Sequence, residues 1–200
     1  MGIISQLEIV NDMLSNLGEA EVNSLTTGHP LATRGVSVLN RSNAREQTKG
    51  WWFNTELVEL APDTQGNIFV PTDTLKVDPW KPSLNYTQRG RLLYNLSSGS
   101  VAPTVFTEPV LCILTRLLPF DDLPATAQFL VSAAAQLTFH LNMDGDDTKL
   151  KLLREEARVA LVGCTAEHIR AVNANLLNNP STQATLGGLR GSSSGLMRIR

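Results

Sequence analysis

The sequence is poor in cysteine, and it lacks any long hydrophobic run. Its 200 residues include two cysteines, Cys112 and Cys164, and aliphatic residues surround both of them. Two buried free thiols are the simplest interpretation, and nothing indicates a disulfide scaffold or a cysteine-rich zinc module. No apolar stretch is long enough to cross a bilayer, and no N-terminal run has the length of a signal peptide. We therefore expect neither membrane insertion nor export.

Charge is also in short supply. Charged residues make up 18% of the chain, and the net charge at pH 7 is −2. Such a chain has no overall attraction for nucleic acid, so contact with a polyanion would need a local basic patch. The hydrophobic content of 42% is typical of a globular protein. The length suffices for one ordinary domain or two small ones, each with a buried core.

Two helices are predicted at the start of the chain. Residues 7–17 carry apolar side chains at helical spacing and end at Gly18; a second helix spans about residues 31–49 and ends at Gly50. Glycine is favoured just after a helix because it adopts the left-handed conformation without a Cβ penalty. An aromatic cluster, residues 51–54, follows the second stop at once. It marks the point where the helix pair meets the next part of the chain.

Helical periodicity disappears between residue 51 and about residue 119. Short apolar runs alternate there with turn residues, and prolines separate them: Pro62, Pro71, Pro79, Pro82, Pro103 and Pro109. Proline is confined to turns and sheet edges, so the pattern predicts several short strands and no long helix. A tight hairpin is predicted at Arg89-Gly90, midway between two tyrosine-containing runs. This segment is expected to form a small antiparallel sheet.

Helical character returns at Pro124, with Asp121 and Asp122 just ahead of the predicted N-terminus. The apolar stripe of this helix comprises Phe129, Leu130, Ala133, Ala134, Leu137 and Leu141. After a break at residues 142–145, a longer helix is predicted from about Asp146. Its apolar face carries Leu150, Leu153, Ala157, Leu161, Cys164, Val172 and Leu176.

The predicted fold class is α+β. We expect a discontinuous helical bundle of about four helices, formed by residues 1–50 and 120–179, with a small antiparallel β region, residues 51–119, inserted into it. Residues 180–200 are rich in Ser, Gly and Thr and contain no acidic residue. Such a segment cannot bury enough apolar surface to fold alone, so a flexible basic tail that orders on a partner is predicted. Its candidate partner-binding residues are Leu189, Arg190, Leu196, Met197, Arg198, Ile199 and Arg200.

Three patterns resemble catalytic or metal sites but lack the required context. Residues 191–195 match G-x-S-x-G literally, yet they lie in the low-complexity tail and after the last histidine. An EF-hand spacing at Asp144, Asp146, Thr148 and Glu155 has Lys149 where the loop needs glycine. Helix-capping carboxylates explain it more simply. Cys164 and His168 share a helix face without a third ligand. We expect no catalytic residue, no metal and no cofactor.

The second helix offers a positive signal. Four cations, Arg34, Arg41, Arg45 and Lys49, follow one another at offsets of seven, four and four residues. These offsets place them within about one angular sector of an ideal helix. Such a basic stripe can follow a phosphate backbone or meet an acidic neighbour, although a solvated surface is the commoner meaning of such charge. We treat it as a candidate DNA-channel or interface surface.

The opening of the chain resembles a known family. Residues 8–19 read EIVNDMLSNLGE, and the second helix closes on KGWWFN at residues 49–54. This order of helix, glycine stop, helix and aromatic cluster is similar to the tail tubular protein A family, the head-to-tail adaptors of short-tailed bacteriophages (podoviruses). A more moderate likeness continues through residues 118–120 and the alanine-rich helix to about residue 142.

The resemblance implies a structural virion protein and not an enzyme. A homo-oligomeric ring, expected to be a dodecamer, would lie between the portal protein and the tail nozzle protein, extend the channel for DNA and support the tail fibres. It would reside at the head–tail junction of the virion, and in the host cytoplasm before assembly. Two other classes stay open: a non-viral cytoplasmic helical adaptor that binds a protein through its tail, and a hydrolase. The hydrolase is the weaker, since no carboxylate or serine constellation is visible.

Overall fold

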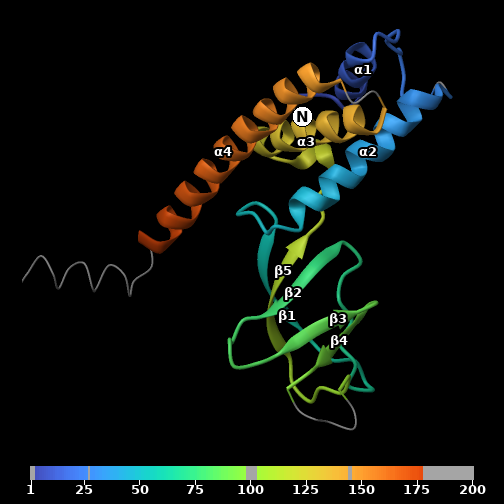
Figure 1. Ribbon diagram of the computed structural model, residues 1–200. Helices are drawn as coiled ribbons and strands as arrows, with labels where there is room; N and C mark the ends of the chain where they lie inside the picture. Colours follow the sequence, from blue (N-terminus) through green and yellow to red (C-terminus); the bar gives the residue numbers. More distant parts are fainter. Residues whose placement is uncertain (1–2, 27, 98–102, 144–145, 178–200) are drawn as a thin grey trace, which may run out of the picture.

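The computed structural model of the chain describes residues 3–26, 28–97, 103–143 and 146–177. Four helices pack together at one end, and five short strands form the other end (Figure 1). The predicted α+β class with about four helices and small antiparallel sheets is confirmed. That the helical and β regions are separate folding domains stays a prediction.

Helix α1, Gln6–Asn16, has defined stops at both ends. Ser5 and Glu8 form a capping box at its N-terminus, which satisfies backbone amides that the first helical turn leaves without partners. At the other end Gly18 has a φ of 77°. The Gly18 amide donates to Ser15 O at 2.9 Å and the Glu19 amide donates to Leu14 O at 3.0 Å, as in a Schellman motif. The predicted glycine stop is therefore confirmed.

Helix α2, Pro30–Gln47, packs closely on α1 and ends before Gly50, whose φ is 75°. A Cβ at Gly35 would lie 3.3 Å from Val10 Cγ1, a tight contact, so a larger residue would require the Val10 side chain to move by a few tenths of an ångström. The 3-10 turn η1, Phe120–Asp122, then leads from the β region into the second helix pair.

Helix α3, Ala125–Met143, lies at the centre of the bundle, and α1, α2 and α4 all pack on it. Within its predicted stripe, Leu130, Ala133 and Ala134 are buried, but Phe129 and Leu141 are 50% and 49% exposed. That part of the prediction is wrong. A helix with three neighbours is buried around most of its circumference, so a single stripe does not describe it. Its buried residues include Gln128, Val131, Ser132, Ala135, Phe139 and His140.

Helix α4, Asp147–Leu177, is the longest element and extends beyond the bundle (Figure 1). Leu150, Leu153 and Cys164 of its predicted face are buried, whereas Leu161 and Val172 are 38% and 39% exposed. The prediction fails at the latter two positions, because the burial of a helix face depends on a neighbour lying against it.

The β region contains two antiparallel sheets instead of one. Strands β1 (Thr55–Leu60), β5 (Val110–Arg116) and β2 (Thr74–Pro79) form a three-stranded sheet in the order β1-β5-β2. Strands β3 (Tyr86–Arg89) and β4 (Leu92–Asn95) form the predicted hairpin, and its turn places Gly90 at a φ of 62°. A single bridge between Phe69 and Leu92 links the hairpin to the segment that precedes β2.

Each region has its own apolar core. The helical core includes Ile9, Met13, Leu39, Phe120, Leu130 and Phe139. The β core includes Ile68, Val70, Leu93, Cys112 and Leu114. The two cores share no residue, and the segments that join the helical and β regions lie between them.

Candidate interaction surfaces

The basic stripe lies on the exposed surface of α2. Arg34, Arg41 and Arg45 are all exposed residues of the helix, whereas Lys49 follows the last helical residue, Gln47. The structure thus keeps three of the four predicted cations on one helix and places the fourth in the turn after it.

A buried carboxylate neutralises one end of this stripe. The Glu46 side chain is 8% exposed; its Oε2 lies 2.5 Å from Lys49 Nζ and its Oε1 lies 3.6 Å from Arg45 Nε. Among the described residues, Arg34 and Arg41 have no ion-pair partner. The part of the stripe that is available to an external anion is therefore its N-terminal half.

A network of buried amides joins the helical and β regions. Asn54 is fully buried: its Oδ1 accepts from the Trp51 amide at 2.8 Å, and its Nδ2 donates to Gln47 O at 3.0 Å and to Arg116 O at 2.8 Å. Gln47 in turn donates to Leu118 O and accepts from the Leu118 amide, both at 2.9 Å. The chain passes from the helical to the β region after α2 and returns after β5, and these hydrogen bonds link the two passages.

Aromatic rings complete this junction. The ring centroids of Trp51 and His168 are 5.6 Å apart, and His168 Nδ1 accepts a hydrogen bond from the Trp52 amide at 3.2 Å. Trp51 also donates from Nε1 to Glu46 O at 2.9 Å. His168 therefore holds α4 to the junction, and the described residues contain no group of three or more metal-ligating side chains. Sequence analysis did not foresee this contact, because α4 and the tryptophans are far apart along the chain.

The other candidate patterns have structural explanations or lie outside the described residues. Asp146 accepts from the Lys149 amide at 2.8 Å, as a helix-capping side chain does, and this hydrogen bond lowers the pKa of Asp146. Asp144, the Gly191–Gly195 pattern and all seven candidate residues of the C-terminal tail are outside the described part of the chain.

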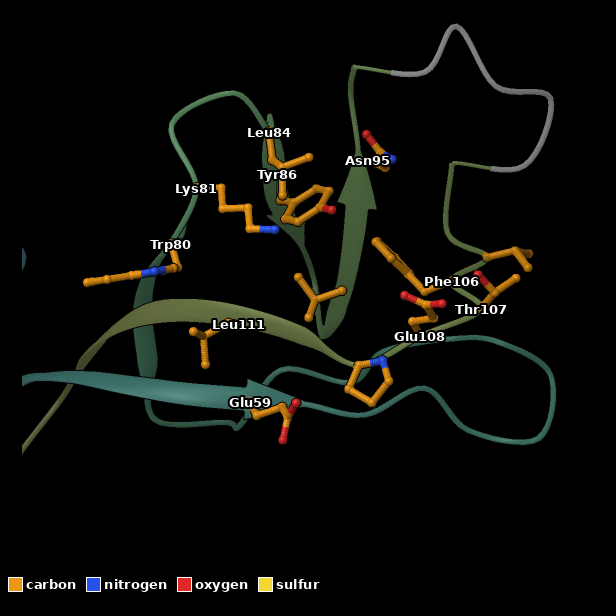
Figure 2. Close-up of a pocket in the computed structure, with 13 residues that line it drawn as sticks. Glu59, Trp80, Lys81, Leu84, Tyr86, Asn95, Phe106, Thr107, Glu108 and Leu111 are labelled. Carbon is orange, nitrogen blue, oxygen red and sulfur yellow. The ribbon is translucent and has the colours of Figure 1, made fainter.

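The β region contains a pocket of about 450 Å³ that the sequence did not indicate. Trp80 and Lys81 lie on one side of it, and Phe106, Thr107 and Glu108 lie on the other (Figure 2). Within the described chain, no ion pair joins one of its lining side chains to another, so Lys81, Glu59 and Glu108 are not paired for acid–base chemistry.

The floor of the same pocket belongs to the β core. Tyr86 packs edge-on against Phe106 with the ring centroids 5.6 Å apart, and burial, with a smaller contribution from Cys112, raises the pKa of the Tyr86 hydroxyl. The walls, in contrast, are open, and the Trp80 side chain is 52% exposed. The arrangement suits contact with another molecule's surface more than chemistry on a small substrate.

Comparison with known proteins adds to these observations. A family model described as "Tail tubular protein" matches residues 7–174, which cover nearly the whole described chain. The chain belongs to the tail tubular protein family. "Tail tubular protein A" of Klebsiella phage KP34 is 30% identical to it over 165 residues, which are 82% of this chain and 87% of that protein. The resemblance seen in the opening helices is thereby confirmed.

Membership in the tail tubular protein family makes the chain a structural component of a phage tail, and not an enzyme. In the residues that the structure describes, no helix is both long enough and apolar enough to span a bilayer. A tail tubular protein acts by assembling with other virion proteins, so its exposed faces are the surfaces of functional interest.

Proposed function

We propose that the chain forms the adaptor ring between the portal protein and the tail nozzle protein. The ring, expected to be a dodecamer, extends the DNA channel and supports attachment of the tail fibres. The observation that carries this proposal is the family match over residues 7–174, because it extends across both the helical and the β region and is not confined to one motif.

The arrangement of the helices supports a ring. A closed ring of identical subunits needs two different surfaces on each subunit, one for each neighbour. Helices α2 and α4 both pack on α3 and barely touch each other, so each has an outer side that the rest of the bundle leaves open (Figure 1).

The tail, residues 180–200, is the proposed contact with the portal. It contains three leucines, Met197, Ile199 and three arginines, a composition that suits a segment that orders on a partner and not a plain linker. Ordering such a segment costs conformational entropy and gives a long contact surface in return.

The proposed site of action is the head–tail junction of the virion, reached from the host cytoplasm during assembly. The non-viral adaptor considered as the alternative has no support, because the family to which the chain belongs consists of phage tail proteins.

Electron microscopy of the protein mixed with purified portal rings tests the proposal. The full chain is expected to add a ring of density below the portal. A chain truncated after Pro180 is expected to stay folded, with the same free energy of unfolding as the full chain, but to lose docking to the portal. A full-length variant with Leu189, Leu196 and Ile199 changed to serine keeps the length of the tail and should also lose docking.

Two results would contradict these expectations. If the full chain adds no ring to the portal, the adaptor proposal is wrong. If the truncated and serine variants dock as the full chain does, the tail is not the portal contact, and the adaptor proposal itself is unaffected.

A further inference from the structure

Charge is divided unevenly between the first two helices. Residues 1–33 contain four carboxylates and no lysine or arginine. Residues 34–50 contain the four cations of the basic stripe and a single carboxylate, the buried Glu46. Because α1 and α2 pack on each other, two neighbouring helices carry charge of opposite sign.

The carboxylates of the first segment gather on one side of α1. The Asn11 side chain accepts from the Val22 amide at 2.9 Å and donates to Val22 O at 3.0 Å, so the chain after α1 folds back along the helix. This brings Glu21 close to Asp12. Partial burial, followed by the like charges of Glu8 and Glu21, raises the pKa of Asp12. We name Glu8, Asp12 and Glu21, all exposed, the acidic surface of α1.

No cation in the described part of the chain forms an ion pair with this acidic surface. Lys149, at the start of α4, donates instead to Asn16 O at the C-terminal end of α1. The Asp12 carboxylate meets a neutral group, since Gln136 Nε2 lies 3.5 Å from Asp12 Oδ2. Like charges that lie together repel each other, and a basic surface from outside the subunit would relieve that repulsion.

The acidic surface of α1 and the basic stripe of α2 face opposite sides of the helix pair. Val10, Leu14 and Ala32 form an apolar cluster where α1 and α2 meet. Asp12 is two positions from both Val10 and Leu14, and Arg34 is two positions from Ala32. Two positions on an α-helix are about 200° apart, so Asp12 and Arg34 both point away from the contact between the helices. The two charged surfaces of one subunit therefore cannot meet each other.

We propose that the basic stripe of α2 in one copy, through Arg34 and Arg41, binds the acidic surface of α1 in the next copy. This deepens the proposed ring, on which it rests, by naming the two surfaces that each subunit contributes. Because the surfaces differ and face opposite sides of the helix pair, the contact is head-to-tail and repeats from copy to copy. Complementary charge selects the partner surface and its register, and like charges disfavour every other pairing of the two.

The phosphate backbone of DNA is the other polyanion that a basic stripe can meet. The acidic surface of a second copy is the better match for two reasons. The chain itself supplies that surface, in the same number of copies as the stripe. The net charge of −2 gives the chain no general attraction for DNA.

Charge reversal in the full-length protein, mixed with purified portal rings, tests the contact. The first variant carries Arg34→Glu and Arg41→Glu, and the second carries Asp12→Lys and Glu21→Lys. Glu8 is left unchanged because it belongs to the capping box of α1. The control variant carries Lys81→Glu and Arg91→Glu, which reverse two exposed cations of the β region and change the net charge as the first variant does.

Each of the first two variants alone is expected to lose the ring, because every contact then joins surfaces of like charge. An equal mixture of the two should recover the ring, since the acidic α2 of one variant fits the basic α1 of the other. The two variants would then alternate around the ring, in a one-to-one ratio by native mass spectrometry. A chain with all four reversals should also form rings, and the control variant should assemble as the unmodified chain does.

Three results would overturn the assignment. Rings formed by the first variant alone would show that the stripe is not a subunit contact, and weaker DNA retention by those rings would assign the stripe to DNA. Failure of both the mixture and the fourfold variant, while the unmodified chain forms rings, would show that the two surfaces are not partners and would leave the ring proposal intact. Absence of rings with the unmodified chain would refute the ring proposal and this interface with it.

Discussion

The helical and β regions are stabilised in the same way inside but are assembled differently along the chain. The helical core draws on α1 and α2 and, more than 70 residues later in the sequence, on α3 and α4, whereas the β core comes from one continuous segment. Both interiors are apolar, yet the junction between them is a network of buried amides around Gln47 and Asn54. Apolar packing is not directional, whereas hydrogen bonds are, so the junction sets how the regions are oriented.

The largest expected effect comes from a cavity in one core. Phe139 is 1% exposed, and Phe139→Ala should lower the free energy of unfolding by about 3–5 kcal/mol. Leu114, fully buried in the β core, is the matched position, and Leu114→Ala should cost about 2–5 kcal/mol. Denaturant unfolding, followed by far-ultraviolet circular dichroism for the helices and by Trp80 fluorescence in single-tryptophan variants, measures both.

These two variants also test whether the regions are separate folding domains. If they are, Phe139→Ala shifts the helical transition and leaves the Trp80 transition in place, and Leu114→Ala does the reverse. A single transition that moves as a whole in both variants would contradict the predicted division into domains.

A smaller effect is expected at the junction. Asn54→Ala removes the acceptor of the Trp51 amide and the donor to Arg116 O, and leaves these buried groups without partners. The expected loss of stability is about 1–3 kcal/mol. Asn40→Ala, an exposed position on α2, is the control and should change stability by less than about 0.5 kcal/mol. Equal effects of the two substitutions would show that the amide network does not stabilise the junction.

The smallest effect concerns an ion pair at the edge of the β region, and it depends on pH. Arg116 Nε lies 2.8 Å from Asp73 Oδ2, and this hydrogen bond holds the pKa of Asp73 below its ordinary value of 3.8. A lowered carboxyl pKa stabilises the fold above pH 3.8, and that contribution is lost as the pH falls through the folded-state pKa. Because the Asp73 side chain is 39% exposed, solvent screening limits it to about 0–1 kcal/mol.

Asp73→Asn should therefore lower the thermal midpoint slightly at pH 7, and the difference from the unmodified chain should fade below about pH 4. Unfolding curves recorded from pH 7 to pH 3 measure it. A difference that persists unchanged at pH 3 would assign the effect to packing and not to the ion pair.

The sequence predicted the elements whose causes are local. Gly18, Gly50 and Gly90 all have positive φ, at the two helix stops and the hairpin turn where they were expected. The family resemblance also came from this opening segment and its aromatic cluster. In contrast, the single apolar stripe predicted for α3 placed Phe129 in the core, although its side chain is half-exposed. Periodicity identifies an apolar face, but it does not state how many neighbours a helix has.

The candidate surfaces divide in the same way. The spacing of Arg34, Arg41 and Arg45 predicted one basic surface, because side-chain direction follows from helix geometry alone. The pocket beside Trp80 and the bond from the Trp52 amide to His168 were not predictable, since each brings together residues from different elements. Glu46 pairs with Lys49, its neighbour in sequence, but the burial of the Glu46 carboxylate depends on tertiary packing. Helix ends, turns and faces thus depend on residues that are neighbours in the sequence. Tertiary packing alone decides which polar groups are buried together and which apolar faces stay open for other subunits.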